Sequence, residues 1–201
     1  MAARRPKPNT RERLLDAALA VFQKHRFDGY TVHAVIKESG ISLGSLYHHF
    51  GSMDGLSAAL YSRCMAALLG EVADAAERVR GARSVVIAIV RAYLAFVARE
   101  PTMASFIHSA PSDGFLQAHA SAIAAEKAPS LERIVSAIRP HVLSGAIVPL
   151  PELLLEMLII GPVAEVARRW IAGVPGLALD EASRKLPERI WCAVRSTRAR
   201  A

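Results

Sequence analysis

The chain has 201 residues, 52% of them hydrophobic, which is enough apolar material for one large or two small globular domains and excludes a disordered polymer. With only 6% aromatic residues, the composition favours helices over strands. The formal net charge of +7, more than half of which lies in residues 1–50, suits a polyanionic partner, although a basic surface also serves solubility or a membrane.

The sequence argues against a zinc-finger protein, a secreted protein and a membrane protein. Cys64 and Cys192 lie far apart without metal-finger spacing, which fits two buried thiols in a reducing compartment. The basic N-terminus is followed by Pro8, Asn9 and Thr10 rather than by an apolar run, so no signal peptide is expected. Charged residues interrupt the most hydrophobic stretch, 150–171, which argues against a membrane span. We therefore expect a cytoplasmic protein with no membrane attachment.

The N-terminal quarter predicts a basic arm followed by three helices. Residues 1–8 offer nothing to bury and are expected to be disordered. A first helix, capped by Asn9 or Thr10, runs to a turn at 27–30 and repeats apolar residues at three-to-four spacing. Two shorter helices follow, over 32–39 and from Ser42 through His49, with Thr31 and Ser42 as N-caps and Gly40 between them.

The helical pattern continues from residue 52 to the C-terminus. A long fourth helix is expected from Ser52 to about Arg80, as the link between two domains. Later helices are predicted over 85–99, 103–109, from Phe115 onward with breaks at Pro129 and Pro140, over 151–172 and over 180–198. The expected fold class is therefore all-α.

Two short helices around a glycine-containing turn, with a basic tail before them and a longer helix behind, are typical of a helix-turn-helix, but also of an ordinary helical hairpin. The residues themselves distinguish the two. Residues 31–50, TVHAVIKESGISLGSLYHHF, closely resemble the helix-turn-helix of the TetR family of transcriptional regulators, of the TetR/AcrR type. Residues 51–56 continue this resemblance, and residues 14–22 are similar to the first helix of that family. The resemblance to the family as a whole covers about residues 10–69.

The resemblance implies a helix-turn-helix DNA-binding domain over 9–69, with the motif itself at about 32–51. It implies a helical effector-binding and dimerisation domain over 70–201. The expected protein is a homodimeric, ligand-responsive transcriptional repressor, not an enzyme, with no cofactor, whose partner is an inverted-repeat operator in double-stranded DNA. Two other classes stay open: a helical ligand carrier or enzyme with a vestigial helix-turn-helix, and a purely structural helical adaptor.

The candidate DNA-binding residues belong to the third predicted helix and to the start of the second. Hydroxyl groups there can bond base edges or phosphates, Leu43 can contact a thymine methyl group, and Gly44 permits close approach. The resemblance places Tyr47 and His49 against the phosphate backbone. Ser42 can instead serve only as a cap, and the histidines can be solvated surface. The full set is Thr31, His33, Ser42, Leu43, Gly44, Ser45, Tyr47, His48 and His49.

Two residues depart from the family pattern. Ile36 stands where the family usually has alanine, and a larger side chain there changes how closely the two short helices approach. Met53 stands where a lysine commonly reaches a phosphate, so one backbone contact is expected to be missing.

The second domain is expected to hold a mainly hydrophobic effector and the dimer contact. The candidate pocket residues are the aromatic and polar side chains of the central helices, which can equally be ordinary core: Tyr61, Tyr93, Phe96, Met103, Phe106, His108, Phe115 and His119. The candidate dimer stripe, which can alternatively be an intramolecular core face, is Leu154, Met157, Leu158, Gly161 and Ala164. No metal site is expected, because His108, His119 and His141 lack the spacing of ligands on one helix.

Overall fold

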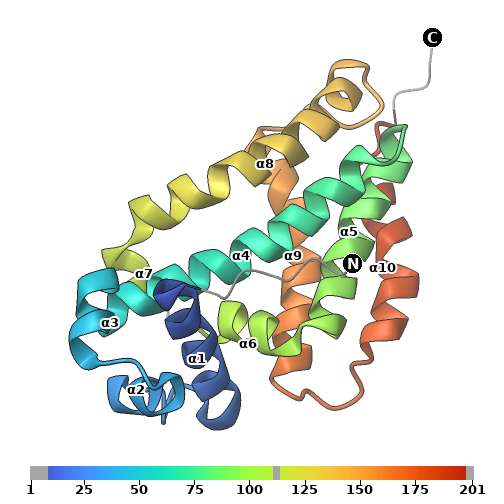
Figure 1. The fold of residues 1–201 in the computed structure, drawn as a ribbon. Coiled ribbons are helices and arrows are strands. Elements are labelled where there is room, and N and C mark those ends of the chain that lie inside the picture. Colours follow the sequence, from blue (N-terminus) through green and yellow to red (C-terminus); the bar gives the residue numbers. More distant parts are fainter. Residues whose placement is uncertain (1–8, 111–113, 198–201) are drawn as a thin grey trace, which may run out of the picture. The chain divides into compact units, whose positions relative to one another are not determined.

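The computed structural model describes residues 9–110 and 114–197, and this part of the chain is all-helical, as the sequence predicts (Figure 1). The predicted arm at 1–8 lies outside the described residues. The chain divides into two units, Met1–Arg63 with Ala110–Ile123, and Cys64–Ser109 with Ala124–Ala201. The sequence pattern predicts that the two domains meet at residues 69 and 70, and it did not assign the segment Ala110–Ile123 to the first unit.

The first unit contains three helices whose starts are fixed by side chains. They are α1 (Thr10–His25), α2 (Val32–Ser39) and α3 (Leu43–Phe50). The Asn9, Thr31 and Ser42 side chains each accept a hydrogen bond from a backbone amide three residues ahead, at 2.9, 3.3 and 3.3 Å. Gly40, with a φ of 66°, ends α2 in the left-handed conformation that glycine adopts without strain.

The same unit also contains the start of α4 (Met53–Glu77), all of α7 (Phe115–Ala118) and the start of α8 (Ala120–Leu143). Its core is mainly aliphatic and includes two buried aromatic rings, Phe22, which is fully buried, and Phe115. The Arg63 guanidinium of α4 lies 2.7 Å from Asp16 and 3.5 Å from Glu12, both on α1. These ion pairs join α4 to α1 behind the two short helices.

The second unit is built around α5 (Ala82–Arg99). Ten of its residues are buried, because their spacing gives this helix apolar side chains around most of its circumference. It packs against α6 (Pro101–Ser109), α9 (Glu152–Ile171) and α10 (Leu179–Val194), as Figure 1 shows. Most of α4 and α8 completes this unit.

The prolines of α8 do not end that helix, and the predicted breaks at Pro129 and Pro140 were wrong. Both residues lie inside a helix that runs from Ala120 to Leu143. Both are exposed, so the backbone carbonyl groups that lose a partner can bond water. Within the described residues, no helix is long and apolar enough to cross a membrane.

Candidate functional site

The third helix of the first unit turns nearly all of its side chains outward. Leu46 alone is buried in α3, whereas Leu43 is 46% and Tyr47 is 47% exposed. Because Leu46 is the only buried side chain of α3, packing inside the unit does not explain the identity of the exposed side chains. Of the predicted DNA-binding residues, the structure places Ser45 half-buried and the others exposed, at the start of α2 or on or beside α3.

The two capping hydroxyl groups remain able to act on a ligand. The Thr31 hydroxyl accepts from the Ala34 amide and the Ser42 hydroxyl accepts from the Ser45 amide. Each hydroxyl keeps its own proton, which it can donate to a phosphate or base acceptor. Capping and DNA contact are therefore compatible at both positions.

The end of α3 and the start of α4 are in very close contact, at a residue that sequence reasoning did not single out. A Cβ atom added to Gly55 would lie 2.0 Å from the Phe50 carbonyl oxygen. Only a glycine lets the backbone of α4 approach α3 this closely, so Gly55 fixes the position of α3 against α4. Met53, two residues earlier, is half-buried and begins α4.

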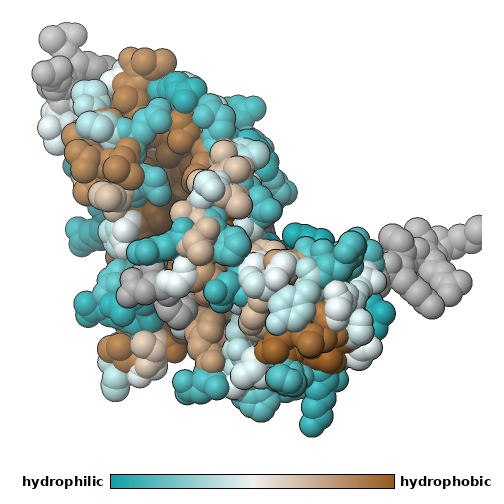
Figure 2. Space-filling model, turned by 90° about the vertical axis from the view of Figure 1, so that its left-hand side faces the viewer, coloured by the Kyte–Doolittle hydropathy of each residue, from teal (hydrophilic) through white to brown (hydrophobic). Residues whose placement is uncertain are grey.

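A cavity of about 670 Å³ lies in the second unit, between α8 and α9, and is floored by α4 and α5. Figure 2 shows hydrophobic side chains gathered inside a hollow of the surface, with hydrophilic ones along its edges. The walls are mainly aliphatic, as with Ile89, Leu131 and Ile159. The polar residues that line it are Tyr93, Lys127, Glu132, Arg139, Glu152 and Glu156.

The structure puts most of the predicted pocket residues elsewhere, and Tyr93 is the one that lines this cavity. Phe96 and Phe106 are buried in the core, and Met103 packs against it. Tyr61, Phe115 and His119 belong to the first unit. The prediction looked for aromatic side chains, whereas this cavity has aliphatic walls. A usable signal was the apolar spacing of α8, given by Leu131, Ile134, Val135, Ile138 and Val142.

His108 contacts the cavity indirectly, through Tyr93. The Tyr93 hydroxyl lies 3.2 Å from the His108 Nε2 atom, which links α5 to α6. Burial lowers the pKa of the His108 imidazole below its ordinary value of 6.5, and the nearby charge of Arg168 lowers it further. The unprotonated nitrogen of a neutral imidazole can accept a hydrogen bond from the Tyr93 hydroxyl.

An apolar stripe runs along the outer side of α9. Leu154, Met157 and Leu158 are 48%, 56% and 39% exposed. Gly161 is exposed and Ala164 half-buried, so the stripe narrows to small residues towards its end. The opposite side of the helix is buried in the core of this unit. Ala164 packs against that core, whereas Leu154, Met157 and Leu158 leave apolar surface in water.

Residues 14–60 match the family model described as bacterial regulatory proteins, tetR family. The transcriptional repressor AcnR of Corynebacterium glutamicum is 38% identical over 64 residues, which are 32% of this chain and 34% of that protein. The chain thus spans about a third of the length of the curated relatives that it matches first.

Two solved structures resemble nearly the whole chain in fold. A TetR family transcription regulator from Marinobacter aquaeolei has a TM-score of 0.72 and 19% identity, covering 92% of this chain and 95% of its own. FadR of Bacillus subtilis, in complex with stearoyl-CoA, has a TM-score of 0.73 and 18% identity, covering 89% and 96%. The match to the tetR family of bacterial regulatory proteins therefore covers residues 14–60, and over nearly its whole length the chain has the same all-helical fold as these two structures.

Proposed function

We propose that this protein is a homodimeric transcriptional repressor that binds an inverted repeat in double-stranded DNA and leaves it when a mainly hydrophobic small molecule enters the cavity. One observation carries the DNA-binding part of the proposal. The recognition helix α3 buries Leu46 alone and leaves hydroxyl, imidazole and phenol groups exposed. Such groups bond phosphates and base edges in a major groove.

The rest of the proposal draws support from the second unit. The exposed stripe of α9, which contains Leu154, Met157 and Leu158, suits a second copy of the chain, because two such stripes can cover one another across a two-fold axis. The cavity suits an effector of moderate size. The names of the relatives agree, since the protein from C. glutamicum is called a repressor and FadR was solved with a bound acyl-CoA.

The decisive experiment is selection of binding sites from random duplexes with the full chain. We expect an inverted repeat whose half-sites are about one helical turn, roughly 34 Å, or a little more apart, because a two-fold dimer presents two recognition helices. Tyr47→Ala is expected to weaken binding to the selected site, whereas Arg184→Ala, at an exposed residue of α10, serves as the matched control. A non-palindromic or single-stranded consensus would refute the proposal.

A carrier or enzyme with a vestigial helix-turn-helix is the competing function. It would bind neither heparin nor nonspecific DNA at low salt, whereas a functional α3 surface retains both. A purely structural adaptor would bind no small molecule, and the large cavity speaks against it.

The Met53 position tests whether α4 begins next to a phosphate. Met53→Lys is expected to tighten specific and nonspecific DNA binding alike and to steepen log K against log salt by about 0.9, the contribution of one neutralised phosphate. The preferred sequence should not change. An unchanged slope in a normally folded variant would mean that this half-buried residue does not face the phosphate backbone.

The dimer contact is tested by placing a charge in the α9 stripe. Met157→Glu is expected to shift the protein from dimer to monomer in sedimentation experiments, because two carboxylates would be buried at the two-fold contact. Glu156→Gln, at the neighbouring exposed residue, is the control and should leave the dimer intact. A wild-type chain that sediments as a monomer would exclude this part of the proposal.

A further inference from the structure

We propose that the ligand of the α8–α9 cavity is a single aliphatic chain that ends in an anionic group, with the anion held by Lys127 and the chain lying along α8 towards Arg139. This inference rests on the proposed function only in taking the cavity as the effector site. It adds the chemical class of the effector and the residue that selects it.

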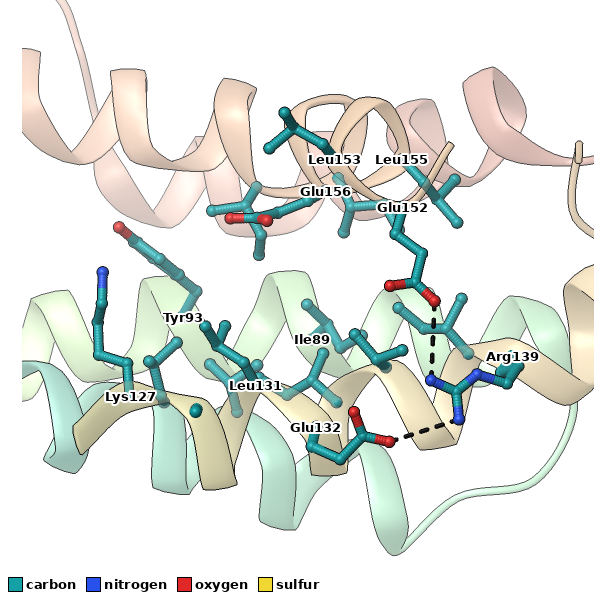
Figure 3. A pocket seen from close by; sticks show the side chains of 18 of the residues that line it. Ile89, Tyr93, Lys127, Leu131, Glu132, Arg139, Glu152, Leu153, Leu155 and Glu156 are labelled. Atoms are coloured by element: carbon teal, nitrogen blue, oxygen red, sulfur yellow. Dashed lines mark hydrogen bonds and ion pairs between the residues drawn. The ribbon is translucent and has the colours of Figure 1, made fainter. Parts of the chain in front are cut away.

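The length of the cavity favours a chain rather than a compact molecule. Its lining residues extend on α8 from Lys127 to Val142, which at about 1.5 Å of rise per residue corresponds to roughly 22 Å of helix axis. Figure 3 shows Lys127 and Tyr93 towards one end, Arg139 at the other, and aliphatic side chains between them. A ligand that fills the cavity must be long and apolar over most of its length.

The walls favour a flexible aliphatic chain rather than a flat aromatic molecule. Among the residues that line the cavity, Tyr93 is the one aromatic side chain, and it is only 5% exposed. Aromatic ligands gain from offset or edge-to-face contacts with rings, which branched aliphatic side chains cannot provide. Isoleucine, leucine and valine instead offer close packing to methylene groups.

The end near Arg139 does not favour an anion. The Arg139 guanidinium lies 3.4 Å from a Glu132 oxygen and 3.7 Å from a Glu152 oxygen, and Figure 3 draws both contacts. These three groups together carry a net charge of −1, so a carboxylate placed there would be repelled. Because all three are substantially exposed, the cluster can remain in water at the mouth while the chain passes beneath it.

The end near Lys127 is different. Lys127 is half-buried, lines the cavity, and makes no ion pair with any other residue of the described ranges. An ammonium group donates hydrogen bonds and accepts none, so its natural partner in an apolar cavity is an anionic oxygen. Glu156 also lines the cavity from α9, but it is exposed, so water and salt screen its charge more effectively.

The test compares head groups on the same chain, using the full-length protein without DNA and calorimetric titration below micelle-forming concentrations. The probes are dodecanoate, dodecanol and dodecyltrimethylammonium, with pyrenecarboxylate as an aromatic acid. We expect dodecanoate to bind at least about tenfold more tightly than each of the others, the gain of one charge-assisted hydrogen bond. Dodecanoyl-CoA is a further probe, and the tighter of the two anionic ligands identifies whether a carboxylate or a phosphate supplies the anion.

Two variants of Lys127 and a control variant of Glu156 identify the residue responsible. Lys127→Met should reduce dodecanoate affinity to the level of dodecanol and leave dodecanol binding unchanged, whereas Lys127→Arg should retain the preference. Glu156→Gln should leave the order of the ligands unchanged. Circular dichroism checks that each variant is folded. The inference fails if the alkylammonium or the aromatic acid binds most tightly, or if folded Lys127→Met still prefers dodecanoate.

The same measurements separate this inference from the proposed function. Tight dodecanoate binding that does not release operator DNA would support the ligand class and refute induction by that ligand. Release of operator DNA by another compound, with no binding of either alkyl anion, would keep the repressor and refute the ligand class.

Discussion

The helices of the two units begin in different ways. In the first unit α1, α2 and α3 each start at a residue whose side chain bonds the first turn. In the second unit α5, α9 and α10 start at Gly81, Pro151 and Ala178, none of which makes a side-chain cap bond. The uncapped helix α5 buries ten residues, whereas the capped helices α2 and α3 bury one each.

The contrast shows that the two units depend on different sources of stability. A helix of eight residues is marginal by itself, so α2 and α3 depend on their caps and on the few side chains they bury. Helices as long as α5 can begin without a cap, because an apolar face buried in the core supplies most of their stability. The four predictions that follow test this contrast, beginning with the largest expected effect.

The core of the second unit should be the most sensitive to truncation. Phe96 is 1% exposed, and Phe96→Ala is expected to destabilise the fold by about 4 kcal/mol through lost burial and the cavity it leaves. Denaturant unfolding followed by tryptophan fluorescence reports on this unit, because Trp170 and Trp191 both belong to it. Val174→Ala, at a residue 41% exposed and outside the α9 stripe, is the control. A loss below about 1 kcal/mol for Phe96→Ala would contradict the dependence on packing.

Two glycines of α4 should respond in opposite directions. Gly55→Ala is expected to cost at least about 2 kcal/mol, because the new Cβ atom would lie 2.0 Å from the Phe50 carbonyl oxygen. Gly70 has nothing within 4 Å of such an atom, so Gly70→Ala is expected to stabilise the helix by up to about 1 kcal/mol. Thermal denaturation measures both. Equal effects would mean that the contact between α3 and α4 does not limit the first unit.

A single substitution should remove the N-cap of α3, and another should add an N-cap to α10. Ser42→Ala removes the cap of α3 and is expected to cost about 1 kcal/mol. Ala178→Ser adds a hydroxyl at an extended residue before α10 and is expected to gain about 0.5–1 kcal/mol. Chemical denaturation of the two variants and the double variant tests both values. No change in Ser42→Ala would show that local caps do not distinguish the first unit.

The smallest effect should appear as a dependence of stability on pH. Because burial lowers the pKa of His108 in the folded state, the unfolded chain binds a proton more readily at this residue. The stability that depends on a neutral His108 is therefore fully present above the ordinary pKa of 6.5. The free energy of unfolding declines as the pH falls below that value. Melting temperatures between pH 7.5 and 5.5 should fall more steeply in the wild type than in His108→Gln. Parallel curves would exclude a neutral, buried His108.

The same contrast explains what the sequence could predict. The bounds of α2 agree with the prediction, because Thr31 and Gly40 mark its two ends by local chemistry. The continuity of α8 was not predicted, since Pro129 and Pro140 carry a local signal that the surroundings of an exposed helix override. The cavity was missed for a related reason: its walls depend on how α8 and α9 pack across long stretches of chain. The apolar spacing of α8 from Leu131 onward indicates one wall of the cavity, but it does not show which helix lies opposite.

The first unit is not continuous along the chain, because Ala110–Ile123 belongs to it after the chain has already formed α5 and α6. Phe115 and Ile123 of this segment are buried. During synthesis, the first unit therefore cannot be completed until α5 and α6 of the second unit have left the ribosome. An engineer who exchanges the N-terminal unit between relatives at a single junction after Arg63 would transplant an incomplete module. A working chimera needs the later segment from the same parent, joined at both of its ends.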